Sequence, residues 1–112
     1  MVVCVPMAAD GTVDGSWGRA PRVSLMWVDD GAITRVEDIE VGWDALHDAG
    51  TEGGHHARIA RFLRENQVEA VVANHMGPPM VQMLGEMKIT TALGASGDAR
   101  AAVLAIAKAG AA

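Results

Sequence analysis

The chain opens with a continuous apolar segment, residues 2–7, that is rich in β-branched side chains. Such a segment is typical of a strand covered on both faces. Pro6 has no N–H to donate to a central ladder, so we expect it at the exit of this strand. A loop rich in small and turn-forming residues follows over 10–19, and a second apolar segment over 23–28 predicts the second strand.

The sequence Asp29-Asp30-Gly31 predicts a tight hairpin turn after the second strand. Asp-Gly readily adopts the positive φ angles that a type I′ turn requires. The third strand is then expected over 33–41. Its charged residues, among them Arg35, Glu37 and Asp38, are typical of an edge strand that faces solvent.

The second half of the chain alternates helical periodicity with short apolar segments after a glycine-rich loop over 42–54. The pattern predicts, in order, a helix from near His55, a strand over 68–73, a helix opened by Gly77-Pro78-Pro79, a strand over 88–93, and a helix after Asp98 that ends at Gly110. Proline is tolerated at a helix start because its missing N–H would have no partner there.

These elements predict an α/β fold of order β-β-β-α-β-α-β-α. Hairpins make the first three strands antiparallel neighbours, and right-handed crossovers make the first, fourth and fifth strands parallel. We therefore expect a mixed five-stranded sheet of order 3-2-1-4-5, with strand 2 antiparallel, flanked by three helices. Ligands of open α/β sheets bind at the carboxyl edge of the strands where the strand order reverses, here between the first and fourth strands.

Size and composition narrow the class of protein. The length of 112 residues suits one domain spanning residues 1–112, and the net charge of −5 without a Lys/Arg stripe argues against a nucleic-acid partner. The single cysteine, Cys4, excludes an intrachain disulfide and fits a reducing compartment. No signal peptide or membrane span is apparent, so we expect a cytoplasmic protein without membrane association, either a monomer or a homodimer.

All four histidines fall at the predicted ligand-binding edge. His47 lies in the loop after the third strand, and His75 follows the fourth strand. The neutral imidazole ligates metals, and a helix N-terminus disfavours the charged form. The candidate metal ligands are therefore His55, His56 and His75. Met76, beside His75, adds a soft thioether donor.

Ordinary structural roles compete with these assignments. Adjacent histidines that open a helix are more often solvated than ligating, and His47 is expected at the surface. Cys4 lies inside the first strand and is interpreted as an unreactive core thiol. Helical spacing predicts a core face formed by Met80, Met83, Leu84 and Met87.

The loop over 10–19 contains two residues with open alternatives. Trp17 either caps an apolar pocket or anchors the loop to the core. Arg19 either binds an anionic ligand or pairs with acidic loop residues. Backbone N–H groups at glycine-rich helix starts are further candidates for binding an anion, and these starts are Gly53-Gly54, Gly77 and Gly94-Ala95-Ser96-Gly97.

Common enzyme motifs are missing from the sequence, including Gly-x-x-x-x-Gly-Lys-Ser/Thr, Gly-x-Ser-x-Gly and His-Glu-x-x-His. The histidine-rich edge also shows no obvious carboxylate partner on a rigid element. A general acid–base pair therefore cannot be assembled, and we expect a binding protein rather than an enzyme.

Several segments resemble one known family in their order and spacing. They are Val5-Pro6, Gly15-Ser16-Trp17-Gly18-Arg19-Ala20-Pro21, Asp30-Gly31, Glu52-Gly53-Gly54, residues 68–73, Met76-Gly77-Pro78 and Gly94-Ala95-Ser96-Gly97. Over nearly its whole length the chain resembles the dinitrogenase iron–molybdenum cofactor biosynthesis family, of the NifX, NafY and NifB C-terminal type. The resemblance implies a ribonuclease H-like fold. It also implies carriage, without turnover, of an iron–molybdenum or iron–sulfur cluster between donor and recipient proteins.

The resemblance also selects residues for cofactor binding. The family's Gly-Arg-Ala-Pro loop corresponds to Gly18-Arg19-Ala20-Pro21, and its Gly-Pro turn to Gly77-Pro78. Some members have histidine and phenylalanine before the loop glycine, and that histidine is a proposed cluster ligand. This chain has Ser16 and Trp17 instead, so His75 or His55 would have to supply the nitrogen.

Two other functions compete with cluster carriage. This chain has Ser16 where some family members have a histidine, which supports a metal-free module that binds a small anion or another protein. The fold alone suggests a nuclease, but such a site needs carboxylates that hold two divalent metals, the first from the middle of the first strand. Val2-Val3-Cys4-Val5 offers none.

Overall fold

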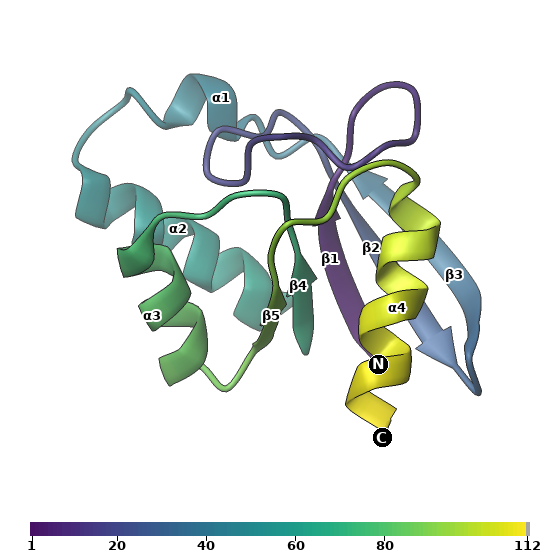
Figure 1. The fold of residues 1–112 in the computed structure, drawn as a ribbon. Coiled ribbons are helices and arrows are strands. Elements are labelled where there is room, and N and C mark those ends of the chain that lie inside the picture. Colours follow the sequence, from purple (N-terminus) through teal and green to yellow (C-terminus); the bar gives the residue numbers. More distant parts are fainter. Residues whose placement is uncertain (112) are drawn as a thin grey trace.

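The computed structural model describes residues 1–111. Its strands are β1 (Val2–Pro6), β2 (Val23–Asp29), β3 (Ala32–Ile39), β4 (Ala70–Val72) and β5 (Thr90–Ala92). Its helices are α1 (Trp43–Leu46), α2 (Glu52–Glu65), α3 (Pro78–Glu86) and α4 (Ala99–Ala111). Figure 1 shows one sheet with helices on both of its faces.

The strand order of the sheet is β3-β2-β1-β4-β5. β1 pairs antiparallel with β2 and parallel with β4, and β4 pairs parallel with β5. The mixed α/β sheet, its strand order and its antiparallel second strand are therefore confirmed. The ribonuclease H-like label does not follow from this order alone and stays a prediction.

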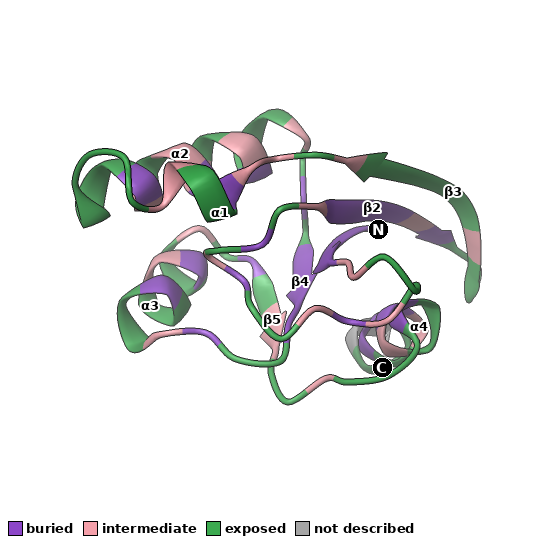
Figure 2. Ribbon diagram, turned by 90° about the horizontal axis from the view of Figure 1, so that it is seen from above, coloured by how far each residue is buried: buried purple, intermediate pink, exposed green. Residues whose placement is uncertain are grey.

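Two apolar cores lie on the two faces of the sheet (Figures 1 and 2). One core packs Leu25 of β2 against Ile59 of α2 and Leu84 of α3. The other packs Met26 of β2 against Val103 of α4. β1 is buried along its whole length because it contributes side chains to both cores, as its continuous apolar sequence predicts.

Residues 1–111 contain four helices, whereas the sequence pattern predicted three. The additional helix, α1, lies in the segment expected to be a glycine-rich loop. Gly42 enters it with a φ of 64°, a left-handed conformation that glycine adopts without strain. Trp43 then buries its ring edge-on against Trp17 and Phe62, with centroid distances of 5.1 and 5.6 Å. This aromatic cluster joins three separate segments and fixes the short helix.

Helix α2 begins at Glu52, before the expected start at His55. Thr51 caps it, because its Oγ1 accepts the N–H of Gly54 at 3.0 Å. Glycine has a low helix propensity, so the pair Gly53-Gly54 suggested a loop where the cap stabilises a helical turn. The predicted strands also extend beyond the observed ones at several ends.

Strand β3 is exposed along most of its length, as its charges predicted (Figure 2). α3 begins with Pro78 and Pro79 after Gly77, and Met80 and Leu84 are buried on its inner face, as the sequence also predicted. Among residues 1–111, none of the helices combines the length and apolar character that crossing a membrane requires.

Candidate functional site

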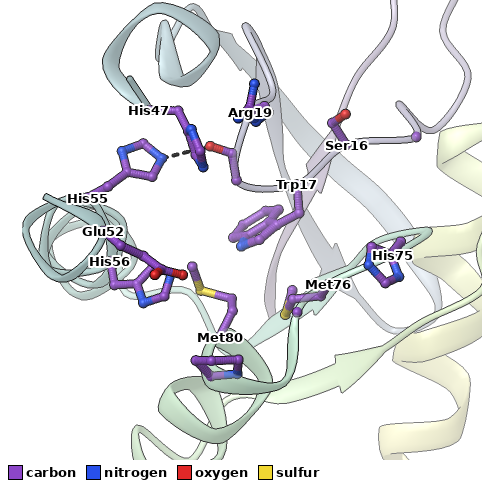
Figure 3. Close-up of a pocket in the computed structure, with 14 residues that line it drawn as sticks. Ser16, Trp17, Arg19, His47, Glu52, His55, His56, His75, Met76 and Met80 are labelled. Atoms are coloured by element: carbon purple, nitrogen blue, oxygen red, sulfur yellow. Dashed lines mark hydrogen bonds and ion pairs between the residues drawn. The ribbon is translucent and has the colours of Figure 1, made fainter. Parts of the chain in front are cut away.

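A cavity of about 270 Å³ opens at the carboxyl edge of β1 and β4, where the strand order reverses (Figure 3). The loop after β1, the segment from α1 to the start of α2, and the β4–α3 connection form its walls. The lining residues are Gly15, Ser16, Trp17, Gly18, Arg19, His47, Glu52, His55, His56, His75, Met76, Gly77, Pro79 and Met80. The cavity therefore lies where strand topology predicts a ligand site.

The predicted site residues divide into two groups. Those that line the cavity are Trp17, Gly18, Arg19, His55, His56, His75, Met76 and Gly77. Those outside its lining are Gly53, Gly54, Pro78, Gly94, Ser96 and Gly97. The turn before α4 contacts other loops instead, since Gly94 donates its N–H to Asn74 O at 2.8 Å and Gly97 O accepts the N–H of Val13 at 2.9 Å.

The helix starts offer few backbone donors to a ligand. The N–H of Gly54 is used by Thr51, and Pro78 and Pro79 have no N–H. At the start of α4 the Asp98 carboxylate accepts the N–H of Ala101 at 3.0 Å, which places a negative charge there. These contacts remove several of the backbone donors that the glycine-rich helix starts suggested.

His55 is buried and ties α2 to the loop after β1. Its Nε2 lies 2.7 Å from Gly18 O, and its Nδ1 lies 2.7 Å from the guanidinium of Arg58. A carbonyl only accepts and a guanidinium only donates, so Nε2 carries the proton and Nδ1 accepts. Both ring nitrogens are engaged in this arrangement. These contacts give His55 a structural role, and its assignment as a metal ligand stays a prediction.

His56 and His75 line the cavity from different sides (Figure 3). His56 is half-buried, with its Nε2 3.9 Å from the Glu52 carboxylate. His75 is exposed on the far side of Trp17 and Met76. Within residues 1–111, no group of three or more histidine, cysteine, aspartate or glutamate side chains is arranged to hold a metal ion. The predicted histidines therefore share one cavity without converging on one point.

Two thioethers lie between these histidines. Met76 and Met80 are 6% and 4% exposed, and both line the cavity (Figure 3). Met80 also belongs to the apolar core, so the core assignment made for it from the sequence holds as well. Sulfur donors of this kind suit soft metal centres and polarizable ligands.

Trp17 supplies a buried donor without a partner. Its side chain packs edge-on against Trp43 and it is 3% exposed. Within the described chain its Nε1 has no hydrogen-bond partner. Figure 3 shows the nitrogen side of the ring facing Glu52 and Met80 across the cavity. A buried unpaired N–H costs about 1–3 kcal/mol, and a ligand that accepts this hydrogen bond would offset that cost.

Arg19 pairs with the acidic loop, one of the two roles left open by the sequence. Its guanidinium lies 3.6 Å from the Asp48 carboxylate, and His47 Nδ1 lies 3.2 Å from the same oxygen. The hydrogen bond from His47 and then the charge of Arg19 lower the pKa of Asp48. Arg19 is itself exposed and lines the cavity, so its charge lies at the site as well as beside Asp48.

A family model described as dinitrogenase iron-molybdenum cofactor matches residues 1–109. The chain belongs to this family. The resemblance seen in the sequence is thereby confirmed over almost the whole chain. No functionally curated protein matches the sequence.

Two solved structures have the fold of this dinitrogenase iron–molybdenum cofactor family member. The crystal structure of PH0822 has a TM-score of 0.76 and 17% sequence identity, covering 97% of this chain and 90% of that one. The apo form of the orange protein from Desulfovibrio gigas has a TM-score of 0.75 and 22% identity, covering 96% and 88%. At these identities the likeness establishes a common fold.

Sequence reasoning missed several lining residues of this family member. They are Gly15, Ser16, His47, Glu52, Pro79 and Met80 as cavity residues. One of them had a usable signal, because Glu52 precedes His56 by one helical turn. His47 was placed at the surface, whereas its ring lies edge-on to that of His55, with centroids 5.2 Å apart.

Proposed function

We propose that this chain is a non-catalytic carrier that binds a metal–sulfur cluster of the iron–molybdenum type as cargo. The observation that carries the proposal is the unpaired Trp17 N–H, which shares one cavity with two buried thioethers and with imidazoles. Family membership supports the class of cargo. Donor and recipient proteins that handle such clusters would be the partners.

The lining chemistry suits an anionic cluster with a sulfide surface. Sulfide accepts hydrogen bonds, and the Trp17 indole is a donor that nothing within residues 1–111 uses. Thioethers of Met76 and Met80 and the imidazole of His56 are soft or borderline donors for an exposed metal atom. Arg19 adds positive charge at the rim, which favours an anionic cargo. These groups bind the cargo, and the proposal involves no turnover.

The size of the cavity also favours a compact inorganic cargo. About 270 Å³ is near the lower end of small-molecule sites, which begin at roughly 300 Å³. Its opening toward the loops around Arg19 and His75 would let a partner protein reach the cargo. Transfer requires such access, whereas a resident structural cofactor would be enclosed.

The proposal is tested by anaerobic titration of the protein with isolated iron–molybdenum cofactor. Bound metal is measured after gel filtration, together with the cofactor's absorbance. We expect stoichiometric uptake by the wild type, and loss of most of it in a Met76→Leu/Met80→Leu variant and in a His56→Ala/His75→Ala variant. The matched control is Met83→Leu, because Met83 is on α3 but outside the cavity lining. Equal uptake by all four proteins would contradict the proposed site.

A metal-free anion-binding module is the second candidate. It is favoured by the lack of a converging ligand group within residues 1–111 and by Ser16 in place of a family histidine. Calorimetric titration with sulfate separates the two functions. Sulfate binding that depends on Arg19, together with no retention of the iron–molybdenum cofactor, would establish this second function in place of the first.

A further inference from the structure

The outer edge of β3 is open. Within the described residues β3 pairs on one side only, with β2, and its side chains are largely exposed. Figure 2 shows it as the exposed strand at the border of the sheet. Val36, at its centre, is 37% exposed and is one of few large apolar side chains on the surface. An open strand edge of this kind is a template for pairing with another chain.

The hydrogen bonds of β2 show which groups of β3 face outward. Met1 and Val28 exchange backbone hydrogen bonds in both directions, at 2.8 and 3.0 Å, so the N–H and C=O of Val28 point toward β1. The backbone groups of successive residues point to alternate sides of a strand, so the N–H and C=O of Trp27 and of Leu25 point toward β3. Their partners are Arg35 and Glu37. Val36, which lies between these two, therefore presents its N–H and C=O to the open edge.

We propose that β3 pairs antiparallel with β3 of a second copy of this chain, with the two Val36 residues directly opposite each other. The sequence Ile33-Thr34-Arg35-Val36-Glu37-Asp38-Ile39 is complementary to itself about Val36. In this register the two Val36 residues exchange a reciprocal pair of backbone hydrogen bonds. The flanking residues form close non-hydrogen-bonded pairs, in which side chains interact most strongly.

Charge fixes this register. Arg35 of each copy lies opposite Glu37 of the other, which gives opposite charges on both sides of the central pair. Arg35 is already held in place, with its guanidinium 4.4 Å above the ring of Trp27 and 3.2 Å from Glu37 of its own strand. If one strand slides along the other, only a shift by an even number of residues keeps the outward-pointing backbone N–H and C=O groups of the two strands opposite each other. A shift by two residues in either direction places Arg35 opposite Arg35 or Glu37 opposite Glu37, and these like-charge pairs are unfavourable.

The same geometry predicts a weak and reversible dimer. β3 has an irregularity where Trp27 pairs with Arg35 and Val28 with Ile33, so Thr34 is an extra residue and the regular ladder is short. The pairing would join two sheets through their β3 edges. It would leave the cavity free, because no residue of β3 lines the cavity, which opens at the carboxyl edge of β1 and β4, away from the outer edge of β3 (Figure 1).

Analytical ultracentrifugation of the full chain over a wide concentration range tests the pairing. We expect the wild type to form a dimer at high concentration. Arg35→Glu and Glu37→Arg should each weaken the dimer by at least about tenfold, because each places like charges opposite each other twice. An equimolar mixture of these two variants should form a heterodimer as strong as the wild-type dimer, because every pair is then complementary.

A second pair of variants controls for surface hydrophobicity and folding. Val36→Lys should also weaken the dimer, whereas Val81→Lys should not, although Val81 on α3 is 36% exposed and thus similar. Thermal unfolding verifies that each variant is folded. A monomeric wild type at every concentration, or a mixture of charge variants that stays monomeric, would overturn the proposal. Neither result bears on cofactor uptake, so the carrier proposal stands or falls separately.

Discussion

His55 Nε2 lies 2.7 Å from the carbonyl oxygen of Gly18, a residue 37 positions earlier in the chain. This hydrogen bond joins the first turns of α2 to the loop after β1, and so fixes two walls of the cavity relative to each other. Arg58 holds the other ring nitrogen and reaches the carbonyl of Leu46 at 3.4 Å. The shape of the candidate site therefore depends on one buried imidazole and the groups on either side of it.

Replacement of His55 by alanine should destabilise the protein. The change leaves Gly18 O and the Arg58 guanidinium without their buried partner, which costs about 2 kcal/mol in the free energy of unfolding. Urea unfolding followed by tryptophan fluorescence measures the change. His75→Ala is the matched control, because that side chain is exposed and its loss should change stability by less than about 0.5 kcal/mol. Equal stability of the two variants would show that the His55 bridge contributes nothing.

Much of the fold was predictable because its signals are local. The apolar segment of β1, the Asp30-Gly31 turn and the charges of β3 each indicate a structure within a few residues, and topology rules then order the strands. α1 was not predictable in this way. It depends on Trp43 packing against Trp17 and Phe62, which come from other segments. The early start of α2 depends on a cap that outweighs two glycines.

The site was predictable in place but not in detail. Strand order located the histidines and the Trp17 loop at one edge, and the cavity is there. Whether a particular imidazole faces a ligand depends on long-range partners that no local pattern encodes. His55 meets a backbone carbonyl of a distant loop, which is invisible in the sequence because any residue has a carbonyl. The indole N–H of Trp17 differs from His55 in that it finds no acceptor among the described residues, and the sequence gives no sign of this either.

Trp17→Phe isolates the contribution of that indole N–H. The variant keeps an aromatic ring against Trp43 but removes the unpaired donor, so we expect stability to change by less than about 1 kcal/mol. Retention of isolated iron–molybdenum cofactor should fall at least about tenfold, the value of one lost hydrogen bond to a charged acceptor. Trp27→Phe, outside the cavity lining, is the control for retention. Undiminished retention by Trp17→Phe would exclude the indole as a contact to the cargo.

Arg19 and His47 both contact the Asp48 carboxylate, and removing either should raise the pKa of Asp48 by a different amount. The His47 hydrogen bond is the larger cause of the lowered pKa, and the charge of Arg19 the smaller. His47→Ala should therefore raise the pKa of Asp48 toward its ordinary value of 3.8 more than Arg19→Ala does. NMR titration of the Asp48 carboxyl carbon measures both. A larger rise in Arg19→Ala would contradict this order of causes.

The same carboxylate sets the direction of a pH effect. Because its pKa is lower in the folded state, Asp48 favours the folded state above pH 3.8, and this contribution disappears as the pH falls through its lower folded pKa. The group is exposed, so the effect on global stability is small. It should appear as a local loosening of the loop around Arg19 and His47. Amide protection factors, which allow for the slower intrinsic exchange in acid, should fall there at low pH, and Asp48→Asn should show the lower protection at neutral pH as well.

The reactivity of the buried Cys4 thiol should report how often the sheet unfolds. Its thiol is fully buried in β1, and burial raises its pKa, so the reactive thiolate is disfavoured in the folded protein. Labelling by a thiol-exchange reagent at pH 8 should therefore proceed only through unfolding, and its rate should follow the population of unfolded protein. The His55→Ala variant, if destabilised by about 2 kcal/mol, should react roughly 30-fold faster than the wild type. His75→Ala should react at the wild-type rate, and Cys4→Ala should not be labelled. A labelling rate that is fast in the wild type and unchanged by His55→Ala would instead show that β1 opens locally, without unfolding of the sheet.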